Sequence, residues 1–598
     1  GIALSHVVAS DSIGATLLID CDGPGEKIQG IDEDESYSIE SNSHSITLHA
    51  ATTVGVIRGL ETVLQLVDAD AHHYFVPAVS INDVPRFRWR GLLIDVSRHF
   101  EPVPEVKRTL DGMAAVKLNV LHWHLSDDQG IRVESRRYPR LQKLSSDSLY
   151  YTQAQIREVV EYARDRGIRV VPEFDMPGHS TAWFVAYPQY ASAPGPYTIA
   201  RNWSGSPAVF DPTRESVYRF INGFIGEMST LFPDAYWHIG GDEVNATQWK
   251  QSARIQKFMA AHHLADNAAL QAYFNQRLSR ILISHHKRMI GWDEILHPDL
   301  PRTTVVQSWR GTQYLGQAAA QGFSGILSSP YYLDAMKSAE QHYLADPLAG
   351  DSTLTPDEIS RVLGGEACMW AELVSQGSID SRIWPRLAAI AERFWSPRSV
   401  TDVADMYRRL AIENARLEQF GLGQESHTDR YLRRIMNGPD IAPLSELLKL
   451  AEPVTLGQRT HTVTVTQLTP LVQIVDAARP DPPDRWRILQ LVHEYVSSPS
   501  TSVAQHDTLM HWFSEWRDFD PRVHDVANHS PLAQAALPAA DALASVGTIG
   551  LAALEARKSG MPLSKAWTDS AIVTLTAADK PQGLLHLVVV PAVRQLLQ

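Results

Sequence analysis

Residues 88–130 read RWRGLLIDVSRHFEPVPEVKRTLDGMAAVKLNVLHWHLSDDQG. Two apolar runs lie in this stretch, Gly91–Val96 and Leu118–Leu125, and an amphipathic segment that opens with prolines joins them. Short apolar runs are typical of buried strands, and a segment with its apolar residues on one side is typical of a helix. The stretch therefore predicts a strand, a helix and a second strand, the repeating unit of α/β folds.

The same alternation continues outward from this stretch. The expected strands are Gly91–Val96, Leu118–Leu125, Ile168–Phe174, Tyr236–Ile239, Met289–Trp292, Thr304–Trp309, Gly325–Leu327 and Val362–Met369. Helical patterns such as Thr152–Arg166 and Thr213–Thr230 lie between them, and Arg382–Phe394 follows the last. Eight such units over about 300 residues predict an α/β fold, the (β/α)8 TIM barrel, which takes about 250 residues or more. A doubly wound sheet is the alternative, but the sequence lacks the glycine-rich loops that nucleotide-binding sheets of that kind usually carry.

The barrel is expected to be the middle of three parts. Residues 1–85 predict a small N-terminal α+β domain, with β-rich runs such as Ser45–His49 and a helix over Thr53–Val67. Residues 86–420 form the expected catalytic barrel. Residues 421–598 predict a mainly helical region of unknown role, with a β-rich or loop piece near Arg459–Val465, and we expect it to serve in packing or dimerisation.

Composition and charge exclude several classes of protein. The 598 residues carry 54 Lys and Arg against 68 Asp and Glu, and the net charge of −14 repels nucleic acid. The two cysteines, Cys21 and Cys368, build neither a disulfide framework nor a cysteine zinc site. The most apolar stretch, Ala535–Leu554, is interrupted by Pro538 and Asp541, so we expect no membrane span. The composition predicts a folded, soluble chain and leaves its compartment open.

Polar and aromatic residues follow the carboxyl end of each expected strand, where barrels of this kind carry their active sites. Tryptophan faces pack against the C–H surface of a sugar ring, and carboxylates and arginine form hydrogen bonds with its hydroxyls. The pattern therefore predicts a sugar site. Its members are Asp95, Ser97, Arg98, His99, His124, Asp127, Asp128, Glu173, Asp175, His179, Asp242, Glu243, Trp292, Asp293, Glu294, Trp309, Arg310, Tyr332, Asp334, Trp370 and Glu372.

Two pairs of residues at the strand ends suggest chemistry. Asp242 and Glu243 are adjacent acids that repel each other in a partly desolvated site, which separates their pKa values and suits one to act as an acid. The spacing His122-x-His124 places both rings on one face of a strand, as in some metal hydrolases. The later strand ends offer Trp, Tyr and Asp instead of further histidines, so we expect both rings to support the site from below.

Five ordered motifs resemble those of a known family. They are DVSRHF over 95–100, HWHLSDDQ over 122–129, PEFDMPGH over 172–179, HIGGDE over 238–243 and WAE over 370–372. Together they resemble β-N-acetylhexosaminidases of glycoside hydrolase family 20, over roughly residues 1–420. The chain departs from the family at Ile131, where a tryptophan is common.

The resemblance implies a role for each site residue. The substrate's own acetamido oxygen attacks the anomeric carbon, Glu243 serves as acid and then base, and Asp242 holds the acetamide N–H. Arg98 and Glu372 grip the O3 and O4 hydroxyls. The remaining implied substrate-binding or supporting residues are Asp127, His179, Trp292, Trp309, Tyr332, Asp334 and Trp370.

The expected protein is thus a retaining exo-β-N-acetylhexosaminidase that removes terminal β-linked GlcNAc or GalNAc, uses no metal or cofactor, and also transfers the sugar to other sugars. Its partner is a carbohydrate, with a homo-oligomer left open and a secreted or periplasmic location compatible with the family. The rival classes are a metal-dependent amidohydrolase and a non-catalytic carbohydrate-binding protein. The second rival does not explain why both Asp242 and Glu243 are present.

Overall fold

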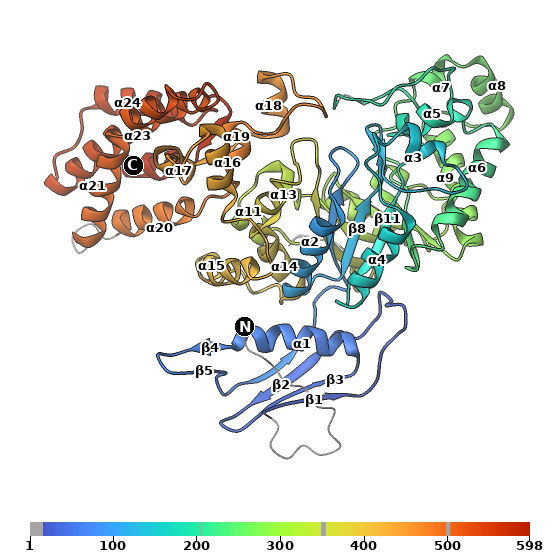
Figure 1. Ribbon diagram of the computed structural model, residues 1–598, viewed down its shortest axis with the longest axis horizontal. Helices are drawn as coiled ribbons and strands as arrows, with labels where there is room; N and C mark the ends of the chain where they lie inside the picture. The colour runs from blue at the N-terminus through green and yellow to red at the C-terminus, as the bar shows by residue number, and fades with distance from the viewer. Residues whose placement is uncertain (1–15, 204, 349–353, 498–502) are drawn as a thin grey trace.

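The computed structural model describes residues 16–203, 205–348, 354–497 and 503–598. Three parts are visible in Figure 1: a small sheet with one helix below, a barrel with its helices above it, and a group of helices beside the barrel. Residues 1–15 of the expected N-terminal domain lie outside the described residues. The boundaries after residues 85 and 420 remain predictions.

The central part is a closed barrel of eight parallel strands. Their order around the barrel is β11, β12, β13, β14, β15, β16, β7 and β8, and β8 pairs with β11 to close it. The prediction of a (β/α)8 barrel is confirmed, and each expected strand corresponds to an observed one. The strands are β7 Trp89–Asp95, β8 Val120–His124, β11 Arg169–Glu173, β12 Tyr236–His238, β13 Arg288–Trp292, β14 Val305–Ser308, β15 Ser324–Leu327 and β16 Val362–Met369.

The barrel interior is filled in layers because alternate residues of a strand point to the same side. The bottom layer is apolar and takes one residue from each strand: Trp89, Val120, Val171, Tyr236, Ile290, Val305, Ile326 and Leu363. Further along the strands follows a polar layer with His122, Glu173, His238, Gln307 and Glu366, each at most 1% exposed. The residues predicted to form the site come next, at the carboxyl ends.

Helices surround the barrel where the pattern places them. Those of the repeating units include α2 Val103–Ala115, α4 Gln153–Arg164, α6 Glu215–Met228, α9 Asn267–Ser284 and α10 Thr312–Ala320. The helix expected over Arg382–Phe394 is wrong as one element: α13 spans Ile379–Ile383 and α14 spans Arg386–Trp395. Pro385 separates the two, because proline has no backbone N–H to continue the ladder of a helix.

The N-terminal part is a four-stranded sheet covered by one helix. The sheet order is β1 Leu17–Cys21, β3 Ile46–Ala50, β2 Tyr37–Ser41 and β6 Ser80–Asp83, and α1 spans Thr53–Leu66. A buried ion-pair group attaches this part to the barrel. The Glu35 carboxylate accepts from Arg58 at 2.8 Å and from Arg90 of β7 at 2.5 Å, and all three side chains are at most 6% exposed. Arg58 also donates to the Gly167 carbonyl before β11 at 2.6 Å.

The C-terminal part is mainly helical, as expected. It contains α16 His427–Met436, α17 Ala442–Leu448, α18 Leu456–Thr462, α19 Ile474–Ala477, α20 Asp484–Ser497, α21 Val503–Arg517, α22 Asp520–Ala527, α23 Leu537–Ser559, α24 Lys565–Ala578 and α25 Val590–Leu596, with a two-stranded sheet of β17 Ala451–Pro453 and β18 Leu585–Leu587. The β-rich or loop piece expected near Arg459–Val465 is wrong for its first half, because a capping box at Thr455 and Gln458 starts the helix α18, which continues to Thr462. Residues 463–465 are loop.

One helix of this part is long and apolar enough to cross a membrane by length and composition, over Ala533–Ser559. Half of its apolar window is buried inside the protein. Its Leu543, Val546 and Leu554 side chains have no exposed surface and pack in the core of the C-terminal part. This burial is that of a core helix.

Candidate active site

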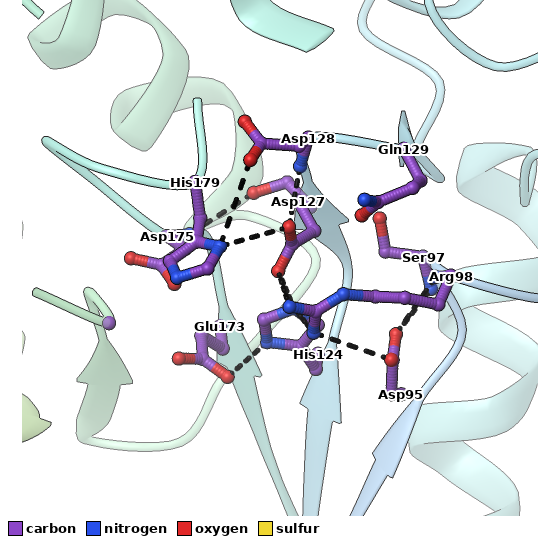
Figure 2. Close-up of polar contacts among 12 residues, drawn as sticks. Asp95, Ser97, Arg98, His124, Asp127, Asp128, Gln129, Glu173, Asp175 and His179 are labelled. Atoms are coloured by element: carbon purple, nitrogen blue, oxygen red, sulfur yellow. Dashed lines mark hydrogen bonds and ion pairs between the residues drawn. The ribbon is translucent and has the colours of Figure 1, made fainter. Parts of the chain in front are cut away.

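A network of charges lies at the carboxyl ends of β7, β8 and β11 (Figure 2). Asp127 stands at its centre: one carboxylate oxygen accepts from Arg98 at 2.8 Å and lies 3.0 Å from His124, and the other lies 3.2 Å from His179. Asp95 adds a second carboxylate to Arg98, at 3.4 Å. Burial alone would lower the pKa of Arg98, but Asp127 and Asp95 raise it well above its ordinary value. The guanidinium is therefore charged and held at the rim.

His179 connects this network to the two adjacent acids. Its Nε2 lies 3.6 Å from a carboxylate oxygen of Glu243 and 3.8 Å from one of Asp242. Burial opposes a charge on His179, but Asp127 outweighs it and raises the pKa of the imidazole well above its ordinary value. The side chain of Glu243 is 58% exposed and that of Asp242 only 16%. One acid therefore faces solvent at the rim, and the other lies behind it.

The backbone around the acids takes conformations that side chains rarely adopt. His179 and Glu243 both have φ of +46°, in the left-handed region. Gly240 has φ of +66°, and a Cβ there would lie 1.8 Å from the Asp175 carboxylate. Backbone strain of this kind persists where the surrounding structure fixes it, and it concentrates at functional sites.

Asp242 shares a buried position with Asp175. Burial raises the pKa of Asp175 well above its ordinary value, and the nearby Asp242 charge adds to the rise. The pKa of Asp242 is also raised by burial, while His179 and a side-chain hydrogen bond with Asp175 oppose the rise. Both pKa values are thus raised, and that of Asp175 further, so Asp175 is the carboxyl that keeps a proton to higher pH. One oxygen of Asp242 has no hydrogen-bond partner within the described part of the chain.

The aromatic residues predicted for the site gather in one cluster on β13 to β16. Trp292, Trp309, Tyr332 and Trp370 pack together around Leu93 and Cys368. The Trp292 and Trp370 rings lie 5.9 Å apart, and the Arg98 guanidinium lies over the Trp370 ring at 5.0 Å. These four rings form an aromatic wall, whose ring faces can pack against an apolar group of a ligand. The acids on the neighbouring strands can bind the polar groups of the same ligand.

Two further acids of the predicted site lie beside this wall. Burial, together with the neighbouring Glu372, raises the pKa of Asp334 to about 8. Burial also raises the pKa of Glu372, and Arg98 opposes that rise. One oxygen of Asp334 has no hydrogen-bond partner among the residues that the structure describes. Buried acceptors without a partner are rare and call for a ligand that donates to them.

His122 and His124 lie below the site, as expected. His122 contacts Glu366 at 2.7 Å and Glu173 at 3.1 Å, and His124 contacts Glu173 at 2.5 Å. Burial opposes charge on His122, but Glu366 and Glu173 raise its pKa to about 9. Glu173 also accepts from Trp292 at 3.0 Å, so this layer supports the aromatic wall.

In the part of the chain that the structure describes, two groups of three residues have ligand atoms within 4.8 Å of one another, close enough for a metal ion. They are His122, Glu173 and His238, and Asp127, Asp175 and His179. A metal binds the deprotonated form of its ligands. The raised pKa values of His122, His179 and Asp175 favour their protonated forms. His122 contacts Glu173 at 3.1 Å and His179 contacts Asp127 at 3.2 Å, so both groups form networks of ion pairs.

The structure brings the eleven residues to which the resemblance gives a role to one end of the barrel, and it shows contacts there that the sequence did not predict. Glu294 accepts from the Trp309 indole at 3.0 Å, and its pKa is raised to about 8 by burial and by the nearby Asp242. Glu294 belongs to the set predicted from the strand ends, but no sequence signal reports its contact with Trp309. Gln467, from the C-terminal part, also reaches the rim at the Arg98 carbonyl.

Comparisons with known proteins agree with this geometry. Residues 87–398 match the model "Glycosyl hydrolase family 20, catalytic domain", and residues 17–84 match "Glycosyl hydrolase family 20, domain 2". The chain is 38% identical over 428 residues to the β-hexosaminidase subunit beta of Mus musculus, covering 69% of this chain and 78% of that one, and 37% identical to that of Homo sapiens over 425 residues, covering 69% and 75%.

Two solved structures are similar as well. A chitobiase of Flavobacterium johnsoniae has a TM-score of 0.92 and 37% identity, covering 98% of this chain and 89% of its own. An exo β-N-acetylglucosaminidase of Vibrio harveyi in complex with N-acetylglucosamine has a TM-score of 0.61 and 29% identity, covering 68% and 69%. The first likeness extends through the C-terminal part, which lies beyond both family models.

Proposed function

This chain belongs to glycoside hydrolase family 20 and is a β-N-acetylhexosaminidase, and from that premise we propose that it removes terminal β-linked N-acetylglucosamine by substrate-assisted catalysis. The acetamido oxygen of the bound sugar attacks the anomeric carbon as the glycosidic bond breaks, which gives an oxazoline-type intermediate. Water then opens the intermediate at the same carbon. Two displacements at one carbon retain the β configuration.

The observation that carries the proposal is the contrast between Asp242 and Glu243. The Asp242 side chain is only 16% exposed, and one of its oxygens has no partner among the described residues. It can accept the acetamide N–H, orient the carbonyl oxygen toward the anomeric carbon, and offset the positive charge that develops as the ring closes. Glu243 is exposed at the rim, where the leaving sugar lies.

Glu243 moves one proton in each half of the reaction. It donates a proton to the leaving oxygen in the first step and takes one from water in the second. In the free protein the hydrogen bond with His179 lowers the pKa of Glu243. A bound sugar excludes water from this carboxyl, and desolvation raises its pKa toward the value that proton donation needs. Asp127 keeps His179 charged and in place throughout the cycle.

The remaining residues recognise the sugar. Arg98 and Glu372 lie close enough for the Arg98 charge to oppose the rise in the pKa of Glu372, and they suit the O3 and O4 hydroxyls. Asp334 offers a buried oxygen to a further hydroxyl. Tyr332 suits the acetamide carbonyl. The three tryptophans of the aromatic wall enclose the acetamide methyl and the ring face.

The proposed reaction also accounts for glycosyl transfer. The intermediate opens to any hydroxyl that reaches its anomeric carbon, and the exposed side of Glu243 leaves room for a sugar acceptor in place of water. Incubation with excess lactose should therefore give a product larger than the released monosaccharide. Absence of any such product removes this part of the proposal.

The test compares two chromogenic glycosides that differ only at carbon 2. The nitrophenyl β-glycoside of N-acetylglucosamine carries the acetamide, and the matching β-glucoside carries a hydroxyl. Release of nitrophenol from the first alone supports acetamide participation. Comparable release from both means that the protein supplies a nucleophile. Release from neither favours a sugar-binding protein, and loss of release with a chelator favours the metal-dependent class.

A further inference from the structure

The rim near Arg98 is completed by a turn from the C-terminal part. Gln467, in the segment between α18 and α19, donates from its side-chain amide to the backbone carbonyls of Arg98 at 3.0 Å and Gln129 at 3.1 Å. Its side-chain oxygen accepts from Arg201 at 2.6 Å, and its backbone N–H donates to the Arg201 carbonyl at 2.7 Å. In Figure 1 the orange segment that follows α18 extends from the C-terminal part toward the barrel.

The turn itself is internally fixed. Two hydrogen bonds join Thr466 and Thr469. The Thr469 N–H donates to the Thr466 carbonyl at 2.9 Å, and the Thr466 N–H donates to the Thr469 hydroxyl at 2.9 Å. A third bond runs from the Leu468 N–H to the Thr466 hydroxyl at 3.3 Å. The turn therefore presents Gln467 on a braced backbone and holds it against the barrel.

The same segment also packs beside Glu372, the second residue proposed to bind the O3 and O4 hydroxyls. Val465 and Leu471, which flank the turn, pack with Leu373 in a small buried cluster, with each side chain at most 7% exposed. Leu373 directly follows Glu372 in the chain. The segment thus contacts the Arg98 backbone on one side and the residue next to Glu372 on the other, and these are the two side chains assigned to the same sugar hydroxyls.

We propose that the turn Thr466–Thr469 is a specificity element of the active site, in which Gln467 is the positioning residue for Arg98. Arg98 follows a strand end and lies in a loop, where only Asp95 and Gln467 fix its backbone polar groups among the described residues. A small shift of that loop moves the guanidinium away from the hydroxyl it recognises. The C-terminal part therefore acts in substrate choice at carbon 4. This inference rests on the proposed function for the hydroxyl that Arg98 binds.

The experiment uses the full-length protein and two sugars that differ at carbon 4, N-acetylglucosamine and N-acetylgalactosamine. Gln467→Ala removes the bonds to both carbonyls, and Gln467→Glu keeps the size but turns an oxygen toward two carbonyl oxygens. Gln490→Ala, at an exposed position on α20, is the matched control. For each protein we would measure kcat and KM on both nitrophenyl glycosides, the dissociation constants of both monosaccharides by calorimetry, and Tm.

Loss of the two hydrogen bonds should raise KM for the preferred epimer roughly tenfold and change kcat less. The ratio of kcat/KM values for the two epimers should fall by a similar factor. Gln467→Glu should do the same or more, and Gln490→Ala should match the wild type. A folded Gln467→Ala protein with wild-type KM and epimer preference overturns the proposal. So does a loss of Tm or kcat with the preference unchanged, because that is a structural effect alone.

A second variant covers the case in which Gln467 variants do not fold. Arg201→Ala leaves Gln467 in place but removes the donor that orients its side-chain oxygen, and it should shift the epimer preference in the same direction by a smaller factor. An unchanged preference overturns the proposal. Failure of acetamide dependence in the wild type would instead refute the proposed mechanism. In that case the ratio of the dissociation constants of the two monosaccharides, measured by calorimetry, still reports on the hydroxyl contacts. The two failures are therefore distinguishable.

Discussion

Glu243→Gln should remove most turnover of a natural oligosaccharide and leave the fold intact. The change removes the proton that the side chain donates and recovers, and it keeps its shape. The Glu243 side chain is 58% exposed, and its ion pair with His179 is long, at 3.6 Å. Substitution at such a position changes the free energy of unfolding by less than about 0.5 kcal/mol. Loss of general acid–base catalysis costs about 10²–10⁴ in rate, or about 3–5 kcal/mol of barrier.

The assay measures kcat and KM on chitobiose and on the nitrophenyl glycoside of N-acetylglucosamine. The loss in kcat should be larger for chitobiose, because a sugar alkoxide needs a proton to leave and a nitrophenolate does not. KM should change little, because the variant still binds the sugar through its ring and acetamide. Glu158→Gln on α4 is the matched control, since that carboxylate is 52% exposed and has a single ion pair, with Lys107.

Wild-type kcat on chitobiose in a folded Glu243→Gln protein would refute the assignment. Equal losses on the two substrates would mean that the side chain does not protonate the leaving group. A comparable loss in the Glu158→Gln control would show that the measured effect is not specific to the rim.

Three further predictions follow from other parts of the molecule. Asp242→Asn should lower kcat/KM for the nitrophenyl glycoside of N-acetylglucosamine by about 10²–10³, because the charge that faces the acetamide is lost; an unchanged value contradicts its role. Burial and Glu372 raise the pKa of Asp334 to about 8 in the fold, so the folded state holds a proton that the unfolded chain loses, and stability falls as pH rises toward 8. Asp334→Asn should reduce the loss of Tm between about pH 5 and pH 8, and an equal loss in both proteins would disprove it. Glu35→Gln should cost about 3–5 kcal/mol in urea unfolding, because it leaves Arg58 and Arg90 buried without a counter-charge, and a cost below about 1 kcal/mol would refute this.

The barrel and its rim could be predicted from the sequence because both follow from local patterns. Each strand is a short apolar run, and the site residues come directly after those runs, so their order along the chain becomes their order around the rim. The position of residues such as Asp242, Arg98 and Trp370 at the rim could be predicted without knowing which strand pairs with which.

Contacts between distant segments could not be predicted in this way. The contacts of His122 with Glu173 and Glu366 depend on the register of three strands. The sequence around a single carboxylate does not show which side chain it will contact. Gln467 is separated from Arg98 by 369 positions and lies in a turn with no motif of its own. The helix α18 was missed because its capping box governs a stretch whose β-branched residues favour a strand.

The filled barrel interior sets the order in which molecules arrive and depart. The floor of the site is made of His122, Glu173, Trp292 and Glu366, with at most 1% of any side chain exposed, so nothing passes through the barrel. The sugar enters and leaves through the same opening as the rest of the chain it was attached to. In the proposed reaction the remaining oligosaccharide lies next to the exposed Glu243 and departs first, and the cleaved monosaccharide beneath it departs last. We therefore expect accumulated monosaccharide to occupy the place that the next substrate needs and to inhibit competitively.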